Sequence, residues 1–294
     1  MREFILGTDF WTDCDDAVAI RLLTKAMRAH EIRLLGVAIN ACMEYSLASL
    51  VGFLRADGVS GIPVGIDLDA TDFGGAPPYQ KRLAERFAPD VTNADAEDAV
   101  RLYRRLLAES EEGGVELIEI GYPQVLAALL MSAGDDISPL DGISLVREKV
   151  AKIWMMAGKW DKDGEKENNF CRADRSRRAG EAFCRLCPVP VTFLGWEVGY
   201  NVLTGGKVDK DDHLYHALLD HGSEKGRHSW DPMLVALALA GDEAAAGYDS
   251  VRGWASVDAE TGANHFRKNE NGHHTYVIKN REDSYYEDLI NGQL

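Results

Sequence analysis

The sequence has 294 residues, of which 46% are hydrophobic, and it carries a formal net charge of −16 at pH 7. This share of apolar side chains is ample for a well-buried core. The negative charge argues against a nucleic-acid backbone or an anionic membrane as the partner. No apolar stretch has the length of a membrane span or of a signal peptide's apolar segment. The five cysteines are odd in number and widely spread, so we expect a reducing cytoplasm rather than a disulfide framework.

Strand-like and helix-like segments alternate along most of the chain. Short apolar runs predict strands at 4–6, 32–39, 62–66, 115–120, 150–156 and 189–194. Helices are predicted at 17–29, at 45–55, from 93 or 95 to 107, from the Gly121-Tyr122-Pro123 turn to Met131, and at 175–186. The segment 67–89, rich in Gly, Pro and Asp, is predicted to be a loop. Such alternation of strands and helices predicts a parallel sheet that is covered on both faces.

The last third of the chain is more mixed. Residues 211–221 and 231–239 favour helices, and 253–257 and 275–279 favour two strands around a polar loop, which we interpret as a late hairpin at the sheet edge. No repeat or linker is visible, so we expect one α/β domain over 1–294, with a mostly parallel central sheet and helices on both faces. In such sheets, ligands bind beyond the carboxyl ends of the strands. The residues directly after predicted strands are Asp9, Asn40, Gly121, Gly158 and Gly195.

The stretch after the first predicted strand is unusually acidic. Asp9, Asp13, Asp15 and Asp16 lie within eight residues, where a strand ends and a helix begins. One or two aspartates at this place would serve as helix caps. Four carboxylates at one chain reversal repel each other, and a hard cation would relieve that repulsion. The local residues therefore indicate a metal site, with an over-acidic cap as the alternative.

Two later segments could contribute to the same rim. Asp231, followed by Pro232, is typical of a helix start. It becomes a second acidic signal for the site only when it is considered together with the first acidic stretch. Glu167 and Asn169 lie in a segment opened by Gly164. An acid and an amide there could bind sugar hydroxyls, because Glu accepts hydrogen bonds while Asn both donates and accepts them. A solvated loop is the alternative for this segment.

Taken together, these segments resemble the inosine–uridine-preferring nucleoside hydrolase family. The opening motif of that family is a strand that ends in Asp-x-Asp-Pro-Gly-x-Asp-Asp-Ala. Residues 5–9 and 14–19 are similar to its two halves, with two extra residues between them. The resemblance continues in the right order through Gly36-Val37, Ile120-Gly121, residues 153–158, Glu167-x-Asn169-Phe170, residues 191–195 and Trp230-Asp231. It therefore spans most of the chain.

The resemblance implies calcium-dependent hydrolysis of the N-glycosidic bond of a ribonucleoside or related N-riboside, giving ribose and a free base. Asp9 would be a metal ligand and the base that activates water. The roles implied for the other residues are metal ligation by Asp16, Asp231 and the main-chain carbonyl of Gln124, and contacts to ribose hydroxyls by Asp15, Glu167 and Asn169. The implied partner is a small nucleoside in purine or pyrimidine salvage, and we expect a homo-oligomer, either a dimer or a tetramer.

The sequence also departs from the family pattern. An alignment without a gap places Trp11 at the base position, whereas a gapped alignment places Asp9 there and keeps Asp13 as the reserve candidate. The family's Gly-Asn loop after the second strand is replaced by residues 40–44, which leaves Asn40 as the candidate substrate contact. Trp230 stands where many members have a histidine that is proposed to protonate the leaving base. A non-catalytic protein that binds a ribosyl ligand or a metal is therefore the alternative function.

Overall fold

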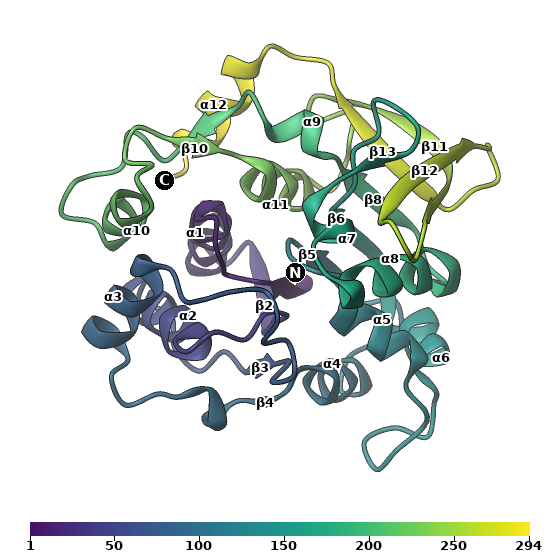
Figure 1. The fold of residues 1–294 in the computed structure, drawn as a ribbon, viewed down its shortest axis with the longest axis horizontal. Helices are drawn as coiled ribbons and strands as arrows, with labels where there is room; N and C mark the ends of the chain where they lie inside the picture. The colour runs from purple at the N-terminus through teal and green to yellow at the C-terminus, as the bar shows by residue number, and fades with distance from the viewer.

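A computed structural model describes residues 1–294 and contains one sheet of eleven strands (Figure 1). The strands are β1 (Arg2–Thr8), β2 (Ile32–Ile39), β3 (Val64–Ile66), β4 (Glu97–Asp98), β5 (Val115–Glu119), β6 (Val150–Met156), β7 (Glu165–Lys166), β8 (Val191–Leu194), β11 (Tyr248–Val257), β12 (Ala263–Lys268) and β13 (His274–Lys279). Their order is β4-β3-β2-β1-β5-β6-β8-β13-β11-β12-β7. Two short strands, β9 (Leu203–Thr204) and β10 (Arg227–His228), form a separate antiparallel pair.

The sheet is parallel from β4 to β13, and the remaining strands are antiparallel. The chain builds outwards in both directions from β1, because β2, β3 and β4 lie on one side of it and β5, β6 and β8 on the other. The junction of β1 and β5 is therefore a topological switch point. In open α/β sheets the loops at the carboxyl ends of such strands diverge and leave a crevice for a ligand.

Helices and apolar side chains cover both faces of the sheet (Figure 1). One core includes side chains of α1 (Asp15–Arg28), α2 (Ser46–Ala56), α3 (Pro78–Phe87), α9 (Trp196–Gly199), α10 (His213–His221), α11 (Trp230–Ala240) and α12 (Asp283–Asn291). The other includes side chains of α4 (Ala99–Ala108), α5 (Gln124–Met131), α6 (Gly142–Lys149), α7 (Asn168–Cys171) and α8 (Asp174–Leu186). Phe4 and Leu6 belong to the first core and Ile5 to the second, as the alternation of a strand requires. None of these helices combines the length and the apolar character that crossing a membrane requires.

The predicted fold class, an α/β fold with a mostly parallel sheet covered by helices on both faces, is confirmed. Two element predictions are wrong. The predicted loop 67–89 contains α3, which follows Pro77 and starts with Pro78, so the prolines begin a helix here rather than prevent one. The late hairpin is not at the edge, because β13 pairs in parallel with β8 and thereby joins β11 and β12 to the main sheet.

Candidate active site

A cavity of about 240 Å³ opens at the carboxyl ends of the central strands. The loop between β1 and α1 supplies one wall, and the ends of β5 and β6 supply the floor. Residues of α7, α9 and α11 complete the lining. Among the residues predicted from the sequence, those that line the cavity are Asp9, Asp13, Asp15, Asp16, Glu167, Asn169, Trp230 and Asp231.

Three buried carboxylates meet at one end of the cavity. One carboxylate oxygen from each of Asp15, Asp16 and Asp231 lies within 4.8 Å of the other two. The residues are only 2%, 2% and 5% exposed. Burial raises the pKa of all three carboxyls, and repulsion from neighbouring acids of the cavity, which include Asp9 and Asp13, raises each pKa further. Such a group of oxygen donors fits a hard divalent cation, which would offset the repulsion.

Main-chain and hydroxyl donors orient the cluster. The main-chain N–H of Asp231 donates to Asp15 Oδ2 at 3.0 Å, so the start of α11 is tied directly to the start of α1. Asp16 Oδ1 accepts the Phe10 N–H at 3.2 Å and also the Thr8 hydroxyl. These few donors leave other carboxylate oxygens free of protein hydrogen bonds, as a metal site requires.

Asp9 lines the same cavity but does not belong to the three-carboxylate cluster. Its Oδ1 accepts the Trp11 N–H at 3.1 Å. Burial raises the pKa of this carboxyl, and the neighbouring acids, with Asp15 the foremost, raise it further. Asp9 is therefore a buried carboxylate that accepts a single hydrogen bond beside the three-carboxylate cluster.

The loop that holds Asp9 and Trp11 is strained and externally supported. Phe10 and Thr12 have positive φ angles of 43° and 37°, which non-glycine residues rarely adopt. The Gln80 side chain donates to the Phe10 carbonyl at 2.6 Å, and the Tyr79 hydroxyl donates to that of Asp13, also at 2.6 Å. Both donors come from α3, so the helix that the sequence prediction missed holds this loop in its conformation.

Asp13 forms an ion pair with Arg227. Arg227 Nε donates to its Oδ1 at 2.6 Å, and Arg227 Nη2 donates to its Oδ2. Asp13 Oδ1 also accepts the Cys14 N–H at 2.7 Å. Both oxygens of Asp13 are therefore occupied by the arginine, whereas Asp9 accepts a single hydrogen bond.

Asn40 and Gln124 are not among the residues that line the cavity. Asn40 is fully buried, donates to Glu119 Oε1 at 2.7 Å and accepts the Tyr122 N–H at 3.0 Å. The Gln124 side chain donates to the Asn40 carbonyl. The predicted substrate contact of Asn40 and the predicted metal contact of the Gln124 carbonyl stay predictions, and the structure gives both residues a supporting role.

Glu119 is a buried acid that the sequence prediction missed. Burial raises its pKa to about 8, although hydrogen bonds from Gly121 and Asn40 oppose the shift. Its second oxygen has no partner, and it fits against Gly7 of β1 only because glycine has no side chain there. An acid at the last position but one of the predicted strand 115–120, shortly before the Gly121 loop, was the available signal.

The segment at the start of α7 contributes polar groups to the opposite wall. Glu167 accepts the N–H groups of Gly158 and Asn169, each at 2.9 Å, and burial raises its pKa to about 7. The Asn169 amide donates to the Met156 carbonyl at 2.9 Å. These bonds fix an acid and an amide toward the cavity, where they can bind hydroxyl groups.

Aromatic rings form the remaining walls. Trp230 stacks on Trp196 with ring centroids 6.2 Å apart, and its indole N–H donates to the Trp196 carbonyl at 2.7 Å. Trp230 therefore offers a flat apolar surface and has no free proton donor. Trp11, which belongs to the acidic loop, also lines the cavity, and its indole N–H donates to the Gly75 carbonyl at 2.8 Å. The prediction included Trp230 but missed Trp196.

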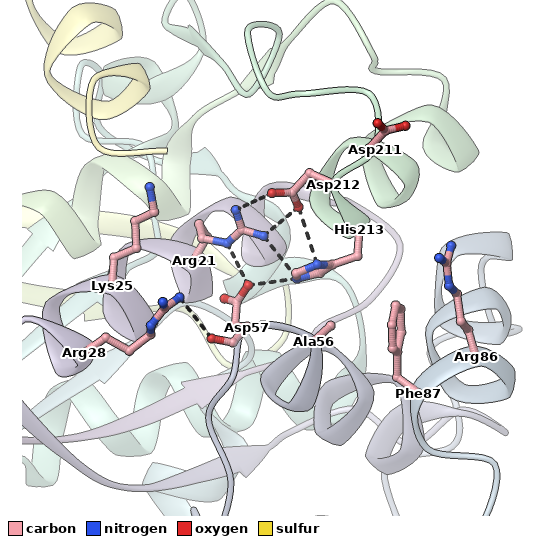
Figure 2. A pocket seen from close by; sticks show the side chains of 10 residues that line it. All are labelled: Arg21, Lys25, Arg28, Ala56, Asp57, Arg86, Phe87, Asp211, Asp212 and His213. Atoms are coloured by element: carbon pink, nitrogen blue, oxygen red, sulfur yellow. Dashed lines mark hydrogen bonds and ion pairs between the residues drawn. The ribbon is translucent and has the colours of Figure 1, made fainter.

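A second cavity, of about 330 Å³, lies between α1, α3 and α10 (Figure 2). At its base, Arg21 Nε donates to Asp57 at 2.8 Å, while its terminal nitrogens donate to both oxygens of Asp212 at 2.7 and 2.9 Å. His213 Nε2 lies 2.8 Å from Asp57 Oδ1. Because these charged groups already pair with one another, they form a junction that anchors α1, the helix that begins with two of the site carboxylates.

Comparisons with solved structures agree with this architecture. A plant nucleoside hydrolase superposes with a TM-score of 0.72 at 15% identity, covering 99% of this chain and 98% of its own. An inosine–uridine-preferring nucleoside hydrolase from Bacillus anthracis has a TM-score of 0.68 at 15% identity, covering 100% and 99%. The type III effector protein XopQ, complexed with adenosine diphosphate ribose, has a TM-score of 0.69 at 17% identity, covering 99% and 93%.

The chain therefore has the nucleoside hydrolase fold over its full length, as the opening motif predicted. No protein-family model and no curated protein matches the sequence. At identities of 15% to 17% the structural likeness establishes the fold, and the chemistry has to be argued from the residues of the cavity.

Proposed function

We propose that this protein hydrolyses the N-glycosidic bond of a ribonucleoside or a related N-riboside and releases ribose and a free base. The observation that carries the proposal is the placement of Asp9 in one cavity with the buried cluster of Asp15, Asp16 and Asp231. The bound cation would be calcium, held by Asp9, Asp16 and Asp231 together with the Gln124 carbonyl. When bound, calcium supplies positive charge that acidifies water and orients the ribose diol.

The side chains that line the cavity perform the remaining steps of the reaction. Asp9 takes the proton from the attacking water. Asp15, Glu167 and Asn169 hold ribose hydroxyl groups and so keep the anomeric carbon in front of that water. Positive charge develops on the sugar as the glycosidic bond breaks, and the surrounding carboxylates stabilise it. The aromatic walls at Trp11 and Trp230 exclude water and offer flat surfaces to a nucleobase.

The second candidate is a protein that binds a ribosyl ligand without cleaving it. It is favoured by one observation, the indole N–H of Trp230, which is bonded to the Trp196 carbonyl and cannot protonate a leaving base. The likeness to an effector complexed with adenosine diphosphate ribose is compatible with this reading.

A panel of ribonucleosides incubated with calcium, with free ribose as the readout, tests the proposal. We expect ribose release to fall by about a hundredfold or more in Asp9→Asn, because a general base contributes at least that much, and to fall strongly in Asp16→Asn. Asp249→Asn changes an exposed aspartate on β11 and is the matched control, which should keep full activity. Ribose release from no nucleoside, together with calcium binding by calorimetry, would refute hydrolysis of unmodified nucleosides and support the binding candidate. If Asp9→Asn were as active as the wild-type protein, the assignment of Asp9 as the general base would be refuted.

A further inference from the structure

One basic side chain lines the acidic cavity. Arg172, at the C-terminal end of α7, is the only Lys, Arg or His among the lining residues, which include six carboxylates. It forms no ion pair with any of them. Its guanidinium lies over the Trp11 ring, 5.1 Å from the centroid, and donates a single long hydrogen bond of 3.3 Å to the Phe73 carbonyl. Most of its N–H donors are therefore free.

Arg172 lies on the side of α7 that lines the cavity. Asn168 and Arg172 are four residues apart, which places them on the same side of one helical turn, and both line the cavity. Glu167 and Asn169 lie on the same segment and reach the cavity one turn earlier. A ligand held by Glu167 and Asn169 therefore has Arg172 as its next neighbour along this wall.

The support under Arg172 is rigid. Trp11 belongs to the loop between β1 and α1 that α3 holds in place, and its indole N–H donates a hydrogen bond to the Gly75 carbonyl. A guanidinium that lies over a hydrogen-bonded indole is pre-oriented and loses little side-chain freedom when it binds. Its planar fork matches a phosphate, to which it can donate two parallel hydrogen bonds.

The chemistry of ribose limits where a phosphate can be. The base occupies the 1′ position of an N-riboside, and the proposed function directs the 2′ and 3′ hydroxyls to the cation and its carboxylates. The 5′ oxygen is the one position that remains for a charged group. We propose, on the basis of the proposed function, that the preferred substrate is a ribonucleoside 5′-phosphate and that Arg172 binds its phosphate.

The test compares each nucleoside with its 5′-monophosphate for the wild-type protein in calcium buffer, with free base as the common readout. We expect kcat/KM to be at least about tenfold higher for the monophosphate, since a charge-assisted hydrogen bond to a cation contributes that much. Arg172→Gln should lower the ratio of the two kcat/KM values by about the same factor. Arg172→Lys should restore it in part, because lysine keeps the charge but not the fork.

A matched control separates this effect from a general loss of positive charge. Arg175 lies three residues further along, outside the cavity lining, and is ion-paired with Asp72 at 2.8 Å. Arg175→Gln should leave the ratio unchanged. The wild-type preference for the monophosphate should also shrink as ionic strength rises, because the contact is electrostatic and partly exposed.

The outcomes distinguish the two proposals. Hydrolysis of nucleosides with no preference for their monophosphates overturns the role of Arg172 and leaves the proposed function standing. If neither class is cleaved, the proposed function fails, and titration calorimetry with adenosine and with its 5′-monophosphate decides the inference. Tighter binding of the monophosphate that is lost in Arg172→Gln supports it, and equal affinities overturn it.

Discussion

Removing one carboxylate from the acidic cluster should stabilise the metal-free protein. In Asp16→Asn the new amide oxygen can still accept from the Phe10 N–H and the Thr8 hydroxyl, so the change removes charge and little else. Oxygens of Asp15, Asp16 and Asp231 lie within 4.8 Å of one another. At an effective dielectric constant of about 20, each pair of charges repels by about 3 kcal/mol.

In the wild-type protein, proton uptake by the carboxylates limits the total electrostatic repulsion. We therefore count the repulsion of a single pair of charges. A gain of about 3 kcal/mol corresponds to a rise in Tm of about 6 °C for a chain of this size. Calcium should reverse the order of stability. A bound ion stabilises the wild-type protein by about 4.1 kcal/mol when its concentration is about a thousand times Kd, which exceeds the gain from removing the charge, whereas the variant has lost a proposed ligand and should gain much less.

Thermal unfolding in EGTA and in excess calcium measures both effects. Asp249→Asn, at an exposed position, should change Tm by less than about 1 °C in either buffer. A lower Tm for Asp16→Asn in EGTA would show that the cluster is not electrostatically strained. An undiminished calcium shift in Asp16→Asn would refute Asp16 as a ligand.

Two further predictions concern charged residues around the site. Arg21→Ala should lower the free energy of unfolding by about 3–5 kcal/mol in chemical denaturation, because it leaves Asp57 and Asp212 without their shared partner at the junction of Figure 2. Arg33→Ala, which removes an exposed ion pair with Glu3, is its control and should cost less than about 1 kcal/mol; similar losses in both would contradict the argument. Glu119 has a folded pKa of about 8 against an ordinary value of 4.5, so its contribution to stability is full below about pH 4.5 and is lost as pH rises through about 8. Glu119→Gln should therefore flatten the fall in stability across that window, and an unchanged pH profile would show that Glu119 stays ionised.

Local sequence was a good guide where one element is decided by its own residues. The predicted strand at 150–156 matches β6, and the predicted strand at 32–39 matches β2. Their near-continuous apolar runs, each interrupted by one basic residue, are typical of a sheet that is buried on both faces. The prediction failed for α3, whose composition resembles a loop, and for β13, whose place beside β8 depends on residues about eighty positions away.

The candidate site also combines features that the sequence indicated with features that only the tertiary structure decided. The sequence alone indicated a cation site in the acidic stretch from Asp9 to Asp16, because clustered acids at the end of a strand repel each other wherever the rest of the chain lies. It ranked Asp9 above Asp13 only through the choice of a gapped alignment, since both are aspartates in one short loop. Tertiary structure separates them, because Arg227 arrives from more than two hundred residues away and occupies both oxygens of Asp13. Folding likewise brings Asp231 to Asp15 and places Arg172 on Trp11. Composition and spacing thus determined which chemistry is available, and only packing between distant segments decided which side chains are left free to carry it out.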